Sequence, residues 1–415
     1  MLYHLFEYLR SAGFDFPGSG LMHYISFRAI TCAVLAILVS MWVGKKIIAK
    51  LQKKQIGETI RDLGLEGQLQ KKGTPTMGGI IILISILIPI LLFGNLANTN
   101  VQLLILTTVW LGALGFIDDY IKVFKHNKEG LNGKYKIVGQ VLLGVIVGLT
   151  LYFTSEQGVS YSRTTIPFVK GNEFDYKWLI PFSGKFVRAL QGGLYVVVIT
   201  FIITACSNGT NLTDGMDGLA AGVSAIVGAT LGVLAYLSGH VGFAEYLNIM
   251  YLPNIGEVTV YVCCFVGALL GFLWYNAFPA QVFMGDTGSL ALGGIIGVLA
   301  IIIRKELLLP ILCGVFLAES LSVIIQRYYF KYTKKKTGTG VRVFRMSPLH
   351  HHYQKENPDA LIQKPRQIHP ENKIVVRFWI VSIRPGCLLD GLLSLCRPHG
   401  PRQTGAWTSR HRGAL

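Results

Sequence analysis

The sequence predicts an all-α protein, a polytopic integral membrane helix bundle of about ten transmembrane helices. Hydrophobic residues make up 51% of the 415 residues, and the mean hydropathy is +0.47. Only 15% are Asp, Glu, Lys or Arg, against about a quarter in a soluble domain. The 47 glycines fit this class, because small residues let membrane helices pack closely. These figures exclude a disordered chain, a coiled coil and an ordinary soluble enzyme.

Apolar runs along the chain define the predicted helices. A transmembrane helix needs about 20 mainly apolar residues, and nine runs reach or approach that length. A tenth candidate begins at Ile374, whereas segment 244–252 is too short and too polar to span and is predicted to be a loop. The nine runs are 22–44, 77–94, 101–117, 137–154, 190–206, 218–238, 258–275, 288–304 and 306–326.

Basic residues in the connecting loops predict the orientation. The positive-inside rule places loops rich in Lys and Arg on the cytoplasmic side. Because the odd-numbered loops are the basic ones, we expect them to be cytoplasmic and, with an even number of helices, both termini to be outside. Loops 45–76, 118–136 and 327–373 carry eight, five and eleven basic residues, loops 95–100 and 239–257 carry none, and loop 155–189, with five, breaks the pattern.

The net charge of +17 fits the same picture. Basic loops that face an anionic leaflet explain it better than the binding of nucleic acid does. The seven cysteines form no Cys-x-x-Cys pair, so we predict small buried thiols rather than disulfides or a zinc site. The first apolar run ends at Gly44-Lys45-Lys46 and is predicted to be a retained helix, not a cleaved signal peptide.

Polar motifs gather in the odd-numbered loops and at their helix ends. Polar loops with no common purpose would not have to share one side of the membrane. The arrangement therefore predicts a single site on the cytoplasmic face. The motifs are Lys71–Gly79, Asp118–Lys122, Asn208–Gly218, Asn276 with Phe283–Ser289, and Pro348–Tyr353.

Asp118 and Asp119 are adjacent carboxylates that directly follow an apolar run. They repel each other and require a counter-charge, which Mg²⁺ supplies where carboxylates and substrate phosphates share one ion. Lys122 lies four residues after Asp118, on the same face of a continuing helix. The alternative interpretation is a solvated helix end with one ion pair.

Asp214 and Asp217 lie in a glycine-containing loop and have two interpretations. They bind a metal, a sugar or a base, with Gly215 permitting close approach of the backbone to a ligand. Alternatively, Asp217 caps the helix that begins near residue 218. Capping does not account for Asn208, Asn211 and Asp214 together.

Asp286 stands between Gly285 and Thr287, just before an apolar helix. It either caps that helix or binds a metal ion with room for a phosphate beside it. Phe283 offers a ring on which a base could stack, or it is an ordinary aromatic that faces lipid or the core. Each residue alone leaves both interpretations open.

His350, His351 and His352 are consecutive. Successive residues on a helix do not share a face, so the three are not expected to bind one zinc ion together. They form a metal tract, or one or two of them contact phosphate and the rest are structural. Lys71 and Thr76 are weaker candidates, since Lys71 read alone is one more basic loop residue.

Together these residues predict phosphoryl transfer. The acids suit Mg²⁺, the lysines and histidines suit phosphate, and the Asn, Asp and Phe side chains suit a nucleotide. No P-loop and no Ser–His–Asp set is evident. Phosphoryl transfer depends mainly on positioning and charge neutralisation, and a site at the cytoplasmic end of a bundle lets a soluble donor meet a lipid acceptor.

The motifs closely resemble those of the bacterial phospho-N-acetylmuramoyl-pentapeptide transferases, within the polyprenyl-phosphate N-acetylhexosamine-1-phosphate transferase superfamily. The resemblance extends from about residue 1 to Ile383, and the PLHHHY form favours the MurNAc-pentapeptide branch over the GlcNAc branch. The matching stretches are GTPTMGG (73–79), DDYIK (118–122), NLTDGMDG (211–218), WYNAFPAQVFMGDTGSLALGG (274–294), SPLHHHY (347–353) and VVRFW (375–379).

The resemblance implies a reaction and its setting. An enzyme of this family moves phospho-MurNAc-pentapeptide from UDP-MurNAc-pentapeptide to undecaprenyl phosphate, giving lipid I and UMP, with Mg²⁺ as cofactor. The family fold has ten transmembrane helices in the bacterial inner membrane, with the active site on the cytoplasmic side, and homodimers occur in it. Whether the reaction is a direct attack or passes through an aspartyl-phosphate stays open.

The resemblance also implies roles for individual residues. Asp286 corresponds to the principal Mg²⁺ ligand, Asp118 to the acid that orients or deprotonates the lipid phosphate, and Asp119 to the second acid of the pair. The nucleotide-pocket positions correspond to Asn211, Asp214, Asp217, Asn276 and Phe283, with backbone from Gly215 and Met216, and the further site positions to Lys71, Thr76, Lys122, Asn208, His350, His351 and His352.

The C-terminus departs from the family. Ile374–Ile383 supplies about 15 Å of helix against a bilayer core of about 30 Å, and Arg384-Pro385-Gly386 then breaks the apolar run. We therefore expect a membrane-embedded transferase domain over 1–383 and an atypical tail over 384–415, frameshifted or fused. The last helix is either short or rebuilt with Cys387–Cys396. Lys334–Gly340 is interpreted as a basic, flexible loop.

Three competing functions follow from the same residues. A related enzyme would use UDP-GlcNAc as donor. A transporter would place its acids within the spans and show internal repeats, whereas here the acids lie at helix ends. An inactive scaffold is the third candidate, because of the altered C-terminus.

Overall fold

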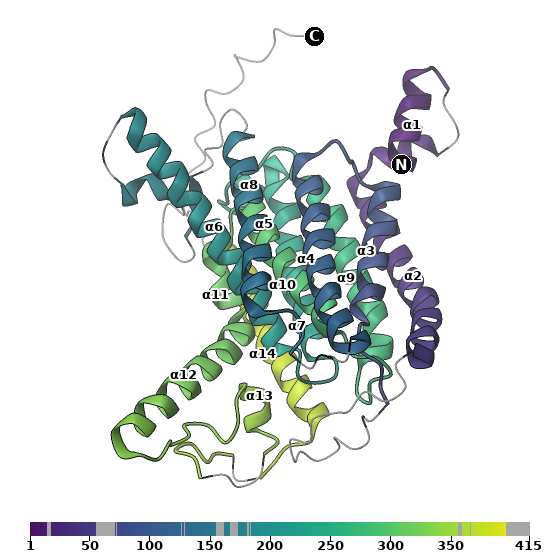
Figure 1. Cartoon of the computed structure of the whole chain (residues 1–415). Helices are drawn as coiled ribbons and strands as arrows, with labels where there is room; N and C mark the ends of the chain where they lie inside the picture. Colours follow the sequence, from purple (N-terminus) through teal and green to yellow (C-terminus); the bar gives the residue numbers. More distant parts are fainter. Residues whose placement is uncertain are drawn as a thin grey trace.

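The structure is a computed structural model, and it forms the helical membrane bundle that the composition predicts (Figure 1). Residues 55–70, which include Arg61, parts of loop 155–189, and residues 396–415 of the predicted tail lie outside the described part of the chain. The described residues are 1–14, 18–54, 71, 73–125, 127, 129–154, 162–166, 173–180, 182, 184–355, 359–365 and 367–395.

Helices account for nearly all the regular structure in these residues. The α-helices are α1 (Leu2–Ser11), α2 (Ile25–Lys54), α3 (Gly79–Phe93), α4 (Thr99–Phe124), α5 (Gly133–Phe153), α6 (Lys185–Thr213), α7 (Leu219–Ser238), α8 (Val241–Tyr246), α9 (Gly256–Asn276), α10 (Gly285–Ile302), α11 (Leu309–Leu312), α12 (Gly314–Thr337), α13 (Leu349–His352) and α14 (Glu371–Leu395). Short 3-10 turns are η1 (Ser19–His23), η3 (Tyr176–Leu179) and η4 (Glu306–Leu308).

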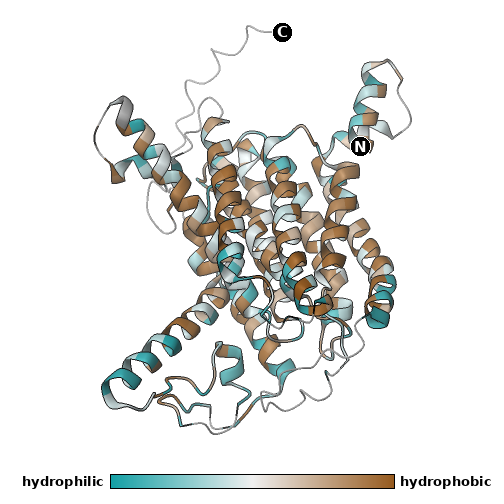
Figure 2. Cartoon of the chain, in the orientation of Figure 1, coloured by the Kyte–Doolittle hydropathy of each residue, from teal (hydrophilic) through white to brown (hydrophobic). Residues whose placement is uncertain are grey.

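Seven of the described helices are long and apolar enough to cross a membrane, namely α2, α4, α5, α6, α7, α9 and α10. The segments Glu306–Leu312 and Gly314–Thr337 would form an eighth span if taken together, and α3 is a shorter apolar helix. The bundle carries apolar side chains along most of its length, with hydrophilic residues at the ends of several helices (Figure 2). The polytopic all-α class is therefore confirmed.

Helix α10 forms the centre of the bundle. Every residue from Thr287 to Ile302 is buried, and α10 packs against α3, α4, α6 and α7. Glycines allow two of these contacts: a Cβ on Gly115 of α4 would overlap the backbone at Asp286, and one on Gly79 of α3 would overlap Gly288. The close approach of α4 and α10 places the acids of both helices side by side.

A small hairpin covers the end of α10 that lies far from α13. Strands β1 (Arg163–Thr165) and β2 (Glu173–Asp175) pair antiparallel, with Thr164 opposite Phe174. The Thr165 amide donates to the Arg304 carbonyl at 3.2 Å, and Lys305 Nζ donates to Thr165 Oγ1 at 2.7 Å. These bonds fix the hairpin to the bundle.

Several predicted boundaries are wrong. Helix α6 continues to Thr213, so Asn208 and Asn211 lie on its last turns and not in a loop. Helix α4 likewise continues through Asp118 to Phe124. The segment 244–252 is a loop only after Tyr246, where α8 ends. In α6 and α4 the polar residues near the helix end lie against another helix, so they do not end the helix.

The last two predicted spans also differ from expectation. The run 306–326 is not one helix, because it bends by 74° at Cys313. The prediction of a flexible loop over Lys334–Gly340 is wrong for its first four residues, because α12 continues to Thr337. The short version of the last helix is wrong as well: α14 passes through Pro385 and ends at Leu395. Its 25 residues give about 37 Å of helix, which is enough to cross a bilayer.

Candidate active site

Three carboxylates form the centre of the site. Asp118 and Asp119, near the C-terminal end of α4, meet Asp286 in the first turn of α10. One ligand oxygen from each lies within 4.8 Å of the others, and Asp118 and Asp119 are buried. Among the described residues this is the one group of His, Cys, Asp or Glu whose atoms could hold a metal ion. The predicted convergence of distant motifs is therefore confirmed for these acids.

Two lysines neutralise the carboxylates. Lys122 forms an ion pair with Asp118, as its i,i+4 spacing predicts, and contacts Asp286 at 3.2 Å. Lys136, in the first turn of α5, contacts Asp118 at 2.9 Å and Asp286 at 2.6 Å. Lys136 is not among the residues that the sequence predicts for this site, because a single lysine among other loop lysines carries no local signal.

Asp119 caps α10 from outside. Its carboxylate accepts the amide of Asp286 at 3.1 Å, and the amide and hydroxyl of Thr287 at 2.9 and 2.6 Å. An acid at a helix N-terminus is stabilised by the unpaired amides there. The capping interpretation of Asp286 is therefore wrong, because Asp119 takes that role and leaves the Asp286 side chain facing the lysines.

Asn211 and Asn208 have different positions. Asn211 Nδ2 donates to Asp286 Oδ1 at 2.9 Å and to Ser289 Oγ at 2.8 Å, so it orients the acid. Asn208, about one turn earlier, donates to Gln140 Oε1 at 2.8 Å. Asn208 therefore contacts α5 and not the carboxylates.

The loop after α6 contributes Asp214 and Gly215. Burial, and then the negative charge of Asp286, raise the pKa of the Asp214 carboxyl to about 8. A Cβ on Gly215 would overlap the ring of His350. Gly215 is therefore needed for the close packing of the histidine motif on this loop, whereas Met216 is buried in the hydrophobic core.

Asp217 belongs to a second charged cluster beside the acids. Lys71 Nζ lies 2.6 Å from both Asp217 Oδ1 and Glu371 Oε1. The Asp217 amide donates to Glu371 at 2.7 Å, and Asp217 Oδ2 accepts the Ala280 amide at 3.0 Å. Asp217 does not cap α7. The N-cap residue of α7 is Gly218, and no side chain forms a capping hydrogen bond at this helix end. Glu371, at the start of α14, was not predicted.

Phe283 lies beside this cluster, with its ring centroid 5.8 Å from Lys71 Nζ. Its backbone pairs with the first motif: the Phe283 amide donates to Pro75, and the Gly78 amide donates to Phe283, each at 2.8 Å. Thr76, from the same stretch, has its hydroxyl close to the position that a Cβ on Gly285 would occupy.

Asn276 supports the local backbone. Its side chain accepts the Gly218 amide at 3.0 Å and donates to the Val282 carbonyl at 2.9 Å. The side chain thus joins the loop after α6 to the segment before α10.

The three histidines have three different environments. His350 is fully buried, with Nδ1 3.1 Å from Glu319 of α12, and its amide also donates to Glu319. Its ring nitrogens make no geometrically good hydrogen bond within the described residues. Burial, and then the neighbouring His350, lower the pKa of His351 to about 4. His352 contacts the Lys364 carbonyl at 2.8 Å and accepts the Arg345 amide, so the backbone occupies both of its ring nitrogens.

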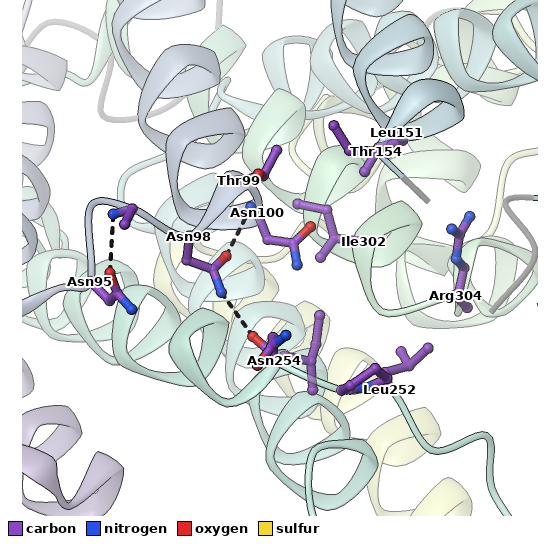
Figure 3. A pocket seen from close by; sticks show the side chains of 13 residues that line it. Asn95, Asn98, Thr99, Asn100, Leu151, Thr154, Leu252, Asn254, Ile302 and Arg304 are labelled. Carbon is purple, nitrogen blue, oxygen red and sulfur yellow. Dashed lines mark hydrogen bonds between the residues drawn. The ribbon is translucent and has the colours of Figure 1, made fainter. Parts of the chain in front are cut away.

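A cavity of about 330 Å³ lies at the other end of the bundle and is separate from this site (Figure 3). Asn98, Asn100, Thr154, Asn254 and Arg304 line it, among others. Helix α4 begins beside this cavity and carries Asp118 near its far end, about 30 Å along the helix.

The fold and the acid cluster together define a class of protein, a multi-pass membrane enzyme with a charged transfer site at one end of its bundle. Residues 101–304 match the family described as Glycosyl transferase family 4. Residues 71–83 match phospho-N-acetylmuramoyl-pentapeptide-transferase signature 1. Both matches include residues that line the site.

Relatives narrow the class to one family. A phospho-N-acetylmuramoyl-pentapeptide-transferase of Parabacteroides distasonis is 56% identical over 408 residues, covering 92% of this chain and 97% of the relative. Those of Porphyromonas gingivalis and Flavobacterium psychrophilum are 56% and 53% identical, with the same coverage. The chain belongs to the phospho-N-acetylmuramoyl-pentapeptide-transferase family and is a multi-pass bacterial membrane protein.

Proposed function

We propose that this protein transfers phospho-MurNAc-pentapeptide from UDP-MurNAc-pentapeptide to undecaprenyl phosphate, giving lipid I and UMP in peptidoglycan synthesis. Its high identity to relatives of that name supports the reaction. The observation that carries the chemistry is the meeting of Asp118, Asp119 and Asp286 beside two lysines. Carboxylates this close to each other stay ionised only where cations neutralise them. The phosphate groups of the two substrates need the same neutralisation.

Mg²⁺ is the proposed cofactor. Carboxylate oxygens are its preferred protein ligands, and the three acids offer oxygens close enough to share an ion. Asp286 is the proposed principal ligand, because both oxygens of Asp119 already accept bonds from α10. When bound, the ion neutralises the donor diphosphate and stabilises the departing UMP.

Asp118 and the two lysines are proposed to hold the acceptor phosphate. A phosphate monoester has a second pKa of about 6, so the acceptor is mostly ionised at neutral pH and a strong base is unnecessary. Lys122 and Lys136 lie on either side of Asp118 and supply the positive charge that two phosphates require. Asp118 then orients the acceptor oxygen.

We favour direct attack. The acceptor oxygen forms a bond to the phosphorus that carries MurNAc, and the bond from that phosphorus to the bridging oxygen breaks, releasing UMP. A two-step path through an aspartyl-phosphate would instead require one acid to attack first. Direct attack fits the ion pairs of Asp118, which hold its carboxylate to two cations.

The second cluster is proposed to bind the nucleotide. Phe283 offers a ring for uracil stacking, and Lys71 lies between that ring and Asp217. Asn211, which donates to Asp286, is proposed to complete the pocket together with Asp214 and the backbone of Gly215 and Met216, which lead to Asp217. His350 and His351 are proposed to contact phosphate, since both ring nitrogens of His350 are buried without a geometrically good hydrogen bond within the described residues.

The lipid chain of the acceptor has a proposed location beside the histidines. A cavity of about 310 Å³ lies between α12, α13 and α14. Val315, Leu349, Tyr353 and Phe378 are among its mainly apolar lining residues, and Arg377 lies there too. An apolar groove that ends near a phosphate site suits a polyprenyl phosphate.

The bacterial inner membrane, with the site on its cytoplasmic side, is the proposed location. The described ends of α2 and α12, both rich in lysine, support this orientation under the positive-inside rule. The division at residue 383 and the homodimer stay predictions from the family resemblance.

A purified-protein assay tests the proposal. Radiolabelled UDP-MurNAc-pentapeptide and undecaprenyl phosphate should yield lipid I with Mg²⁺ present and none after chelation. UDP-GlcNAc should give no lipid product. Product formation that survives chelation contradicts the metal, whereas equal use of UDP-GlcNAc contradicts the donor.

A further inference from the structure

Helix α12 leaves the bundle at a steep angle. Its axis is bent by 74° from the preceding segment Glu306–Leu312, and its C-terminal half projects away from the other helices (Figure 1). This projecting half has one face toward segment 341–345 and one face that no described residue covers.

The uncovered face changes character in a fixed order along the helix. Leu317, Leu321, Ile324 and Ile325 come first, each 43–49% exposed. Tyr328 and Tyr332 follow, 71% and 61% exposed. The exposed Lys334, Lys335 and Lys336 end the helix, with exposed Arg327 and Lys331 before them. Figure 2 shows the same change from apolar to hydrophilic along α12.

This order is that of a membrane interface. Apolar side chains face lipid tails, tyrosines sit at the boundary, and lysines reach the headgroups. No acid occurs between Ser320 and Thr337, and none of the five cations forms an ion pair within the described part of the chain. The basic end of α12 therefore carries uncompensated positive charge beside a lipid-facing surface.

We propose that the C-terminal half of α12, Arg327–Lys336, is a binding site for anionic phospholipid headgroups of the leaflet nearest the active site. Charge complementarity favours these headgroups over a neutral lipid. The continuous apolar and tyrosine face favours a lipid over an acidic soluble partner, which would leave those side chains in water.

The opposite face of α12 links this site to the histidines. Gln326 Oε1 accepts the amides of Val343 and Phe344 at 3.0 and 2.9 Å, and Thr333 Oγ1 accepts the Val341 amide at 2.9 Å. Earlier in the same helix, Glu319 contacts His350, which follows segment 341–345 in the chain. Headgroups that hold the end of α12 thus also restrain the segment leading to the active site, so anionic lipid raises turnover.

The test compares two variants of equal charge. In K334Q/K335Q/K336Q the basic end of α12 is neutralised, and in K50Q/K53Q/K54Q the same charge is removed from the end of α2. Each lysine near an anionic surface strengthens binding about fivefold, so the α12 variant should bind phosphatidylglycerol about 100-fold more weakly. Native mass spectrometry of the whole protein in neutral detergent, titrated with that lipid, measures this binding.

Turnover is measured in vesicles of phosphatidylcholine alone and with roughly one-quarter phosphatidylglycerol. The unchanged protein and the α2 variant should be faster in the mixed vesicles, while the α12 variant should have the same rate in both and keep its rate in phosphatidylcholine. Equal losses in the two variants, or undiminished phosphatidylglycerol binding by the α12 variant, would overturn the proposal. The readout is the ratio of the turnover rates in the two kinds of vesicle. A protein that is inactive in both kinds would therefore count against the proposed reaction and not against the lipid site.

Discussion

The two ends of the α10 helix bury charged groups in opposite ways. At the hairpin end, Lys305 and Glu306 each bond a neutral partner, Thr165 at 2.7 Å and the Tyr176 hydroxyl at 2.9 Å. At the other end, three carboxylates share two lysines. A buried charge whose hydrogen-bond partners are neutral groups fixed in the fold has one stable arrangement. Carboxylates that share movable cations can exchange those cations for a metal and phosphates, so only the second arrangement suits chemistry.

Substitution of Asp286, the acid that faces the lysines, should have the largest effect on turnover and so tests most strongly whether this end of α10 carries the chemistry. In Asp286→Asn the amide keeps the shape but removes the charge, and turnover should fall about 10³-fold or more. Lipid I formation measures the rate, and the melting temperature in detergent measures folding. Thr165→Val at the hairpin end is the matched control: it removes a hydrogen bond from the buried Lys305 ammonium, which is worth about 2 kcal/mol, and should leave turnover unchanged. Near-normal UMP release from Asp286→Asn would contradict the assignment.

Lys136→Gln should have the next largest effect. The change leaves the buried Asp118 with Lys122 and the Leu131 amide as its described partners, so the acceptor phosphate loses one of two cations. We expect turnover to fall about 100-fold, in the range of other charge-assisted contacts in active sites.

Lys134→Gln is the control for this variant, since Lys134 is exposed in the same turn of α5. A steady-state assay at saturating donor and varied undecaprenyl phosphate compares the two. Equal activity of the two variants would mean that Lys136 only balances charge in the fold.

The sequence predicts the site residues that belong to local motifs, but not the isolated charged residues that join the site through packing. The sequence predicts the three acids because Asp118 and Asp119 are adjacent at the end of an apolar run and Asp286 follows a glycine at the start of one, and such local patterns are visible in the sequence. Lys136, Glu371 and Glu319 were missed. Each is a single charge on a helix, and its partner comes from a segment far along the chain, so only the packing reveals it.

Helix geometry shows the same division. The apolar runs predicted the spans, because hydropathy over 20 residues is a strong signal. The bend at Cys313 and the continuation of α14 through Pro385 were not predicted. Both depend on neighbouring helices, which decide whether a local break in the pattern ends a helix or only changes its direction.

Glu319→Gln tests the positioning of His350 and should have a smaller effect. Glutamine still accepts one hydrogen bond but lacks the charge beside the ring, so the histidine is held less firmly. Turnover should fall about 10-fold with little change in KM for the donor. Glu319→Asp keeps the charge and should recover part of the rate. If neither variant differs from the unchanged protein in turnover, His350 does not depend on this carboxylate.

The smallest expected effect is a change of stability with pH, caused by Lys305 at the hairpin end of α10. Burial lowers the pKa of Lys305 to about 8 from an ordinary value of 10.5. Between these two values the unfolded chain holds more protons than the folded one, so stability gains a contribution as pH rises from about 8 to 10.5. Below pH 8 the buried ammonium destabilises the fold by a constant amount.

The melting temperature of the unchanged protein, minus that of Lys305→Met, should therefore rise by a few degrees between about pH 8 and 10.5 and stay flat from about pH 6 to 7.5. A difference that is flat throughout would mean that the ammonium is as well solvated in the fold as in water, and the contrast between the two ends of α10 would then rest on the acids alone.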